Sequence, residues 1–283
     1  MKCRPKRYKR FVTLQKNGGK EGLVLFDGAR KDVCRYRNIL GKTVPVLASE
    51  TAVTERCNAG RFCVSSGTLC VPFDGTVAPK VYVLQRENTP PMTHGKIIAV
   101  LLPVPAARPA FPVAHFVAVP EDVMLFEPDI KALLGTREDW PQTRMYCLQE
   151  KSCGAVLYAK HGGKIYYLLI RNQSGHIGFP KGHMEYGENE METIVREIRE
   201  ETGLAITPDI SFREEYDYML CGVIHKKAVY CIAEFNYYSE ITLGPNEIFG
   251  KWLVPYEEAR KKLLFANDRS VLQKAHRRIL GIR

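Results

Sequence analysis

The sequence predicts an α/β protein of two domains, in which a mixed sheet between helices follows a mainly β, barrel-like half. After about residue 146, strand-like and helical segments alternate, which is typical of a sheet covered by helices. The part before residue 145 has many prolines, short apolar runs and few helical periods, which favours a barrel or small sheet. A chain of 283 residues is long enough for two such domains.

The second half of the chain carries the more regular pattern. Gly162 and Gly163 separate the first two strand-like segments and predict a hairpin between them. The expected strands are 152–160, 164–171, 211–219, 227–235 and 250–254, and the expected helices are 188–202, 256–265 and 268–280.

The first half contains strand-like runs at 23–26, 43–47, 80–84, 97–103 and 113–119, followed by a helical stretch at 128–134. The boundary between the halves is expected within 138–149, because Trp140-Pro141 interrupts any helix and a new strand follows. The predicted domains are therefore residues 1–145 and 146–283.

The chain is strongly basic, with a formal net charge of +10. Six of the first ten residues are Lys or Arg and none is acidic. This balance favours polyanionic partners, whether nucleotides or RNA. A solvated basic tail is the alternative for the first ten residues. The charge supports a phosphate-rich substrate without establishing RNA as a partner.

The nine cysteines are scattered and form no Cys-x-x-Cys pair. The clustered Cys57, Cys63 and Cys70 fit no common zinc-site spacing. No apolar signal segment follows the basic start, and no apolar run approaches the ~20 residues that span a bilayer. We therefore expect a cytoplasmic protein with reduced thiols and no membrane segment.

Three glutamates are expected on one face of the helix at 188–202. Residues three and four apart share a helix face, so Glu197, Glu200 and Glu201 bring three carboxylates together. Such hard oxygen ligands suit Mg²⁺ or Mn²⁺, which would bridge to phosphate oxygens of a substrate. The opposite face is apolar and should anchor the helix to a core; its residues are Met191, Ile194, Val195 and Ile198.

Glycines and one arginine frame this helix. Gly182 and Gly187 allow a tight loop before it, and Gly203 can end it in a left-handed conformation. Arg196 is positioned to hold one carboxylate by a charge-assisted hydrogen bond. The alternative is a solvent-exposed helix stabilised by pairs of Glu and Arg side chains.

Together these residues resemble the signature box of the Nudix hydrolases at every defining position. The matching residues are Gly182, Glu188, Arg196, Glu197, Ile198, Glu200, Glu201, Gly203 and Leu204. The resemblance implies an α/β/α sandwich that hydrolyses a nucleoside diphosphate linked to another group. It implies that Gly182 and the three glutamates hold the metal, and that Arg196 belongs to the catalytic set. The general base stays open among Glu200, Glu201 and Glu247.

A narrower resemblance concerns the substrate. The segment 179–183, from Phe179 to His183, together with Phe212, Tyr216, Tyr218 and Lys226, is similar to the asymmetrical diadenosine tetraphosphate hydrolase branch. It implies that His183 and Lys226 contact the phosphate chain, that Lys181 also binds the substrate, and that Tyr218 stacks on adenine. Diphosphoinositol polyphosphates and RNA 5′ ends are alternative substrates, and a non-catalytic nucleotide sensor is an alternative function. The intact box favours hydrolysis.

The first half has a second resemblance, over residues 38–122, to the barrel of soluble inorganic pyrophosphatases. Of that family's three metal-binding acidic positions only Asp74 is retained, since Thr76 and Lys80 stand at the others. Without those carboxylates the metals cannot be held. The resemblance thus implies a degenerate, inactive barrel, and an unrelated β domain is the alternative.

Overall fold

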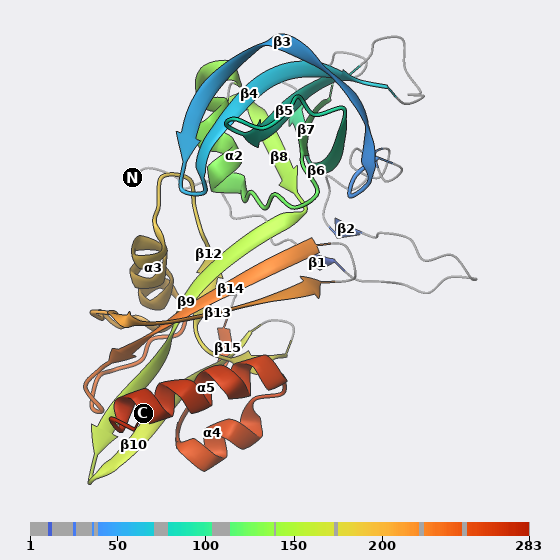
Figure 1. Cartoon of the computed structure of the whole chain (residues 1–283). Coiled ribbons are helices and arrows are strands. Elements are labelled where there is room, and N and C mark those ends of the chain that lie inside the picture. Colours follow the sequence, from blue (N-terminus) through green and yellow to red (C-terminus); the bar gives the residue numbers. More distant parts are fainter. Residues whose placement is uncertain are drawn as a thin grey trace. The chain divides into compact units, whose positions relative to one another are not determined.

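The computed structural model describes residues 11–12, 25–26, 36, 39–70, 79–103, 114–138, 140–172, 175–220, 224–244 and 248–282. The chain divides into two compact units, Met1–Glu150 with Met219–His225, and Lys151–Tyr218 with Lys226–Arg283. The predicted mixed α/β class is confirmed (Figure 1). The boundary between residues 145 and 146 stays a prediction. The basic cluster of the first ten residues and Asp74 with Thr76 lie outside the described residues.

The first unit is built on a closed ring of strands. The order is β3-β4-β5-β7-β6, and β3 also pairs with β6, so five strands close on themselves while β8 pairs with β6. Only the β5–β7 pair of this sheet is parallel. The strands are β3 (Thr43–Cys57), β4 (Gly60–Leu69), β5 (Lys80–Arg86), β6 (His94–Pro103), β7 (His115–Val119) and β8 (Thr143–Cys147).

Short elements complete this unit. Helix α2 (Glu127–Leu134) is followed by two 3₁₀ turns, η1 (Gly135–Arg137) and η2 (Trp140–Gln142). Strands β1 (Phe11–Val12) and β2 (Leu25–Phe26) form a separate antiparallel pair.

The sequence predicts strand β5 of this barrel but not strand β4. Tyr82 and Leu84 belong to one apolar cluster, and Val81 and Val83 to another, so both faces of β5 are buried. A strand buried on both faces is a continuous apolar run. Strand β4 was not expected, because its exposed Ser66 and Thr68 interrupt any such run.

The second unit contains a mixed sheet in the order β11-β10-β9-β14-β13, with β12 on β9 and β15 on β10. Strand β10 is antiparallel to its three neighbours. The Phe235 N–H donates to the Tyr158 carbonyl at 3.0 Å and the His225 N–H to the Leu148 carbonyl at 2.9 Å, so β14 runs parallel to β9. The strands are β9 (Gln149–His161), β10 (Lys164–Asn172), β11 (Ile177–Gly178), β12 (Lys181–His183), β13 (Asp209–Leu220), β14 (Ile224–Glu234) and β15 (Ile248–Pro255).

Helices cover both faces of this sheet (Figure 1). Helix α3 (Glu190–Thr202) packs through Ile194 and Ile198 onto one face. Helices α4 (Tyr256–Lys262) and α5 (Ala266–Ile279) cover the other face, where α5 contributes Val271 and Leu272. The predicted helix at 256–265 was too long by three residues. No described helix is long and apolar enough to cross a membrane.

The apolar stripe of α3 is narrower than expected. Ile198 is fully buried and Ile194 is 4% exposed, but Val195 is 37% exposed. Including Val195 in the anchoring face was therefore wrong, because it lies one position past the stripe and faces solvent. The helix is held to the sheet mainly by the two isoleucines.

We expect Ile198→Ala to lower the free energy of unfolding by about 2–5 kcal/mol, since truncation leaves a cavity under α3. Val195→Ala on the same helix is the matched control and should change it by no more than about 0.5 kcal/mol. Urea unfolding followed by circular dichroism measures both. Equal losses in the two variants would contradict this packing.

Candidate active site

The loop before α3 is fixed by a reciprocal cap. The Asn189 side chain accepts the Glu192 N–H at 3.0 Å, and the Glu192 carboxylate accepts the Asn189 N–H at 2.8 Å. Such a capping box satisfies two backbone donors and sets where a helix begins. At the other end Gly203 adopts a φ of 74°, as a left-handed cap requires. The helix is thereby limited to the residues that carry the acidic groups.

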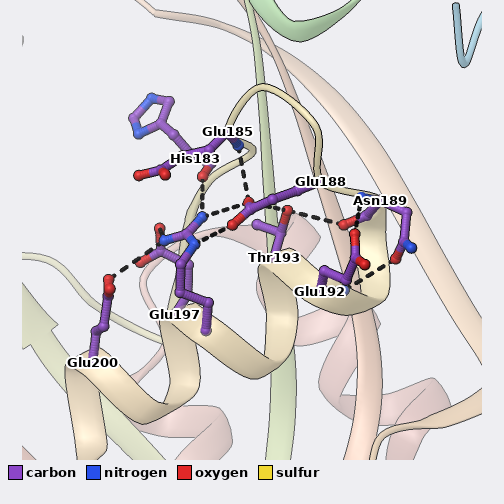
Figure 2. Close-up of polar contacts among 9 residues, drawn as sticks. His183, Glu185, Glu188, Asn189, Glu192, Thr193, Glu197 and Glu200 are labelled. Carbon is purple, nitrogen blue, oxygen red and sulfur yellow. Dashed lines mark hydrogen bonds and ion pairs between the residues drawn. The ribbon is translucent and has the colours of Figure 1, made fainter.

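Arg196 hydrogen-bonds to Glu188, Glu197, Glu200 and His183, four residues that Figure 2 labels. Its guanidinium donates to both carboxylate oxygens of Glu188, at 2.7 Å for Nη2–Oε2. It also reaches Glu197 at 2.5 Å and Glu200 at 3.4 Å, and donates to the His183 carbonyl at 2.8 Å. One cation therefore contacts three carboxylates and ties the preceding loop to the helix. The sequence had suggested a single carboxylate partner.

Glu188 lies in the loop before α3 and accepts hydrogen bonds from Arg196. Burial disfavours its charge, but hydrogen bonds from Arg196, the Glu185 N–H and the Thr193 hydroxyl prevail and lower its pKa to about 2. Glu188 is thus an ionised anchor at neutral pH. The sequence identifies Glu188 only as a position of the signature box, because a contact between a loop residue and a helix residue eight positions later leaves no periodic pattern.

Glu190 fastens the start of α3 to the sheet. Arg213 of β13 donates to it from Nε at 2.7 Å and Nη2 at 2.8 Å, and Lys151 of β9 lies 2.7 Å away. The Arg213 hydrogen bonds are the main reason that the pKa of Glu190 falls to about 2. The junction between the loop and α3 is therefore held by charge-assisted contacts from Arg196 and from Arg213 with Lys151.

Gly182 is required by the position of Glu197. A Cβ atom at residue 182 would lie 2.0 Å from the carboxyl carbon of Glu197, which no side chain allows. The Glu197 residue is only 4% exposed. The loop glycine thus lets a buried carboxylate pack directly against backbone.

The other two acidic groups have different surroundings. Glu201 is 9% exposed and its Oε2 accepts the Lys181 N–H at 2.8 Å. The Glu200 side chain is 30% exposed and contacts Arg196. The three glutamates therefore share one side of α3 but differ in access to solvent.

The remaining predicted residues lie on neighbouring strands. Lys226 Nζ and His183 Nε2 are 3.4 Å apart, which brings together two of the predicted phosphate-binding groups. The ring of Tyr218 packs beside that of Tyr216 with centroids 5.9 Å apart. Tyr230 is 1% exposed and belongs to the core. Lys181 contributes its backbone N–H to the site.

Glu247 lies outside the described residues. The chain just before it is close to the acidic helix, because the Gly244 N–H donates to the Glu201 carbonyl at 3.1 Å. A Cβ at Gly244 would lie 2.5 Å from the Glu200 carbonyl oxygen. A role for Glu247 as base stays a prediction.

The donor chemistry of the site fits a hard cation, although Arg196 engages part of it. Carboxylate oxygens are the ligands that Mg²⁺ and Mn²⁺ prefer. In the described part of the chain, no group of three or more His, Cys, Asp or Glu side chains could hold a metal ion as it stands. Arg196 contacts Glu197 and Glu200, and the Lys181 N–H holds Glu201.

The low pKa of Glu188 makes stability depend on pH. A carboxyl group whose pKa is lower folded than unfolded stabilises the protein above its unfolded value, near 4.5. That contribution disappears as pH falls toward 2. We expect Glu188→Gln to cost roughly 3 kcal/mol at pH 7 and to flatten the loss of stability between pH 5 and 3.

Urea titrations at a series of pH values measure this effect. Glu258→Gln, which changes a carboxylate on α4 with a 52% exposed side chain, is the control and should follow the unmodified protein. Parallel curves for Glu188→Gln and the unmodified protein would show that the anchor contributes no pH dependence.

The chain matches known proteins over this second half. A family model of the NUDIX domain matches residues 149–275. The asymmetrical bis(5'-nucleosyl)-tetraphosphatase of Mus musculus is 33% identical over 138 residues, covering 44% of this chain and 92% of the relative. The enzyme of the same name from Rattus norvegicus is 32% identical with the same coverage.

A solved structure gives a further similarity. The structure described as a C. elegans Ap4A hydrolase binary complex has 29% sequence identity and a TM-score of 0.45, and covers 47% of this chain and 99% of that chain. The sequence relatives, of which this chain spans almost the full length, decide the family. The chain belongs to the Nudix family of pyrophosphohydrolases, and its Nudix domain is similar to the asymmetrical bis(5'-nucleosyl)-tetraphosphatases.

Proposed function

We propose that the protein hydrolyses a phosphoanhydride bond in a nucleoside polyphosphate and that its substrates are dinucleotides like diadenosine tetraphosphate. The main support is the acidic face of α3, where Arg196 contacts Glu197 and Glu200 and the Lys181 N–H contacts Glu201. The relatives support the substrate class, because they are named for asymmetrical cleavage of bis(5'-nucleosyl) tetraphosphates.

We infer that Mg²⁺ or Mn²⁺ is the cofactor and that Glu197, Glu200, Glu201 and Gly182 would hold it. When bound, such an ion supplies positive charge to the phosphate oxygens and makes a nearby water more acidic. Burial of Glu197 and Glu201 favours this role, since a buried carboxylate needs a compensating charge. Arg196 provides part of that compensation in the present structure.

The other predicted residues would bind the substrate. His183 and Lys226 lie 3.4 Å apart and together present donors to a phosphate chain. Lys181 lies next to the acidic face, since its backbone N–H binds Glu201. Tyr218 offers an aromatic ring on which a nucleobase could stack. Glu200 has the more accessible side chain of the pair Glu200 and Glu201, which favours it for proton transfer from water. Glu247 is the third acid to test.

One observation concerns the alternative substrates, and another concerns the location of the protein. The net charge of +10 would also suit RNA 5′ ends or diphosphoinositol polyphosphates. The six described cysteines are all free thiols, which supports the proposed cytoplasmic location.

The decisive experiment is product analysis with the full chain, Mg²⁺ and diadenosine tetraphosphate. We expect asymmetrical cleavage to ATP and AMP, and a loss of kcat of about 100-fold or more in Glu201→Gln, because a ligand of the required charge is removed. Glu258→Gln controls for the loss of a surface carboxylate and should retain full activity.

Two results would contradict the proposal, and a third would contradict the expectation that the barrel is inactive. Binding of the dinucleotide without turnover would favour a nucleotide sensor. Cleavage of RNA 5′ ends or diphosphoinositol polyphosphates in place of the dinucleotide would change the substrate class. Pyrophosphate hydrolysis that survives Glu201→Gln would assign activity to the barrel.

A further inference from the structure

Asp268 is a buried carboxylate outside the acidic set of α3. It lies in the first turn of α5 and is 6% exposed. The Tyr216 hydroxyl donates to its Oδ1 at 2.6 Å, and Tyr230 in turn hydrogen-bonds to Tyr216. This chain of two tyrosines, both in the apolar core region of the second unit, fixes the orientation of the Asp268 carboxylate.

The second oxygen of Asp268 is not satisfied in the same way. Among the described residues no group donates a hydrogen bond to Oδ2. This oxygen faces Gly178, where an added Cβ would find it at 3.9 Å and no other heavy atom within 4 Å. A buried acceptor without a donor costs about 1–3 kcal/mol, so its presence calls for a ligand or a functional reason.

The surroundings of Oδ2 connect it to the proposed active site. Burial raises the pKa of Asp268, and the positive charges of Lys181, Arg269 and His176 oppose that rise. The Arg269 guanidinium is already used, because its Nη1 donates to the Leu263 and Leu264 carbonyls at 2.9 and 2.8 Å. Lys181 donates its backbone N–H to Glu201. Lys181 therefore belongs to the surroundings of both Asp268 and Glu201.

An aromatic pair lies at the start of α5, the helix that carries Asp268. The ring of His176 contacts that of Phe265 edge to face, with centroids 5.3 Å apart. Phe265 directly precedes α5 and is 47% exposed, although its side chain is large and apolar. An exposed ring three residues before a buried acceptor, at the start of one helix, suits a flat group that carries hydrogen-bond donors.

We propose that Asp268 and Gly178 form a nucleoside subsite, in which Asp268 Oδ2 accepts a hydrogen bond from a donor group of the substrate nucleoside. This rests on the proposed function, since the phosphates of the same substrate would lie at α3. The donor is either the exocyclic amine of the base or a ribose hydroxyl. Gly178 leaves the space through which that donor reaches the oxygen.

The test replaces the acceptor Oδ2 of Asp268 with a hydrogen-bond donor. Asp268→Asn retains an oxygen for Tyr216 and presents an amide NH₂ where Oδ2 was. We expect the ratio of kcat/KM for the adenine dinucleotide over its 6-oxo (hypoxanthine) analogue to fall roughly ten-fold or more, because hydrogen bonds to charged groups discriminate at this level. If the ribose is read, the loss appears instead in the ratio over the 2′- and 3′-deoxy analogues.

Two further variants separate recognition from folding. Gly178→Ala meets only an ordinary contact at 3.9 Å, so it should fold and should raise KM for the dinucleotide with little change in kcat. Asp209→Asn replaces an acid with a 44% exposed side chain that pairs with Arg278, and should leave every ratio unchanged. Thermal unfolding of each variant verifies the fold.

The outcomes distinguish this inference from the proposed function. If the full chain cleaves the dinucleotide and Asp268→Asn leaves all the ratios unchanged, the subsite is wrong and the function stands. If no substrate is cleaved, calorimetric binding of ATP, ITP and deoxy-ATP to the full chain and to Asp268→Asn still tests it. A change in preference among these nucleotides supports the subsite, and identical preferences overturn it.

Discussion

The contacts of Arg196 are the interaction on which the rest of the site depends. Glu188, Glu197 and Glu200 place three negative charges near one turn of a helix, and the guanidinium contacts all of them while also binding the His183 carbonyl. Its fixed, planar set of donors allows this, whereas the point charge of a lysine would not. Because the same group joins loop and helix, the geometry of Gly182 against Glu197 follows from it.

Environment distinguishes glutamates that are equivalent in sequence. Glu188 is an ionised anchor, Glu197 is buried against a glycine, Glu201 receives a backbone N–H, and Glu200 retains access to solvent. Residues of one type acquire separate tasks in this way, because burial and hydrogen bonding set the charge and reach of each carboxylate. The glutamates of this site therefore differ in burial, in hydrogen bonding and in access to solvent.

The second unit contains two chemically different regions. One holds the carboxylates of α3, suited to phosphate chemistry. The other holds the tyrosines that end at Asp268, on the helix that Phe265 precedes. A dinucleoside polyphosphate has the same division between a charged chain and flat, donor-bearing ends. Gly182 leaves room for the Glu197 carboxylate to approach backbone, whereas a Cβ at Gly178 would meet the Asp268 carboxylate only at 3.9 Å.

The sequence by itself determined the family, the acidic helix and most strands of the second unit, because helical periodicity and fixed spacing act within short segments. The sequence did not predict strand β4, because exposed polar residues interrupt its apolar pattern. It also predicted that Val195 belongs to the buried face of α3, whereas this residue is exposed. Only the tertiary structure decided that β3 closes onto β6, that Glu188 reaches Arg196, and that Asp268 meets Tyr216 fifty-two residues earlier in the chain. These contacts join distant segments, so packing, and not local pattern, selects them.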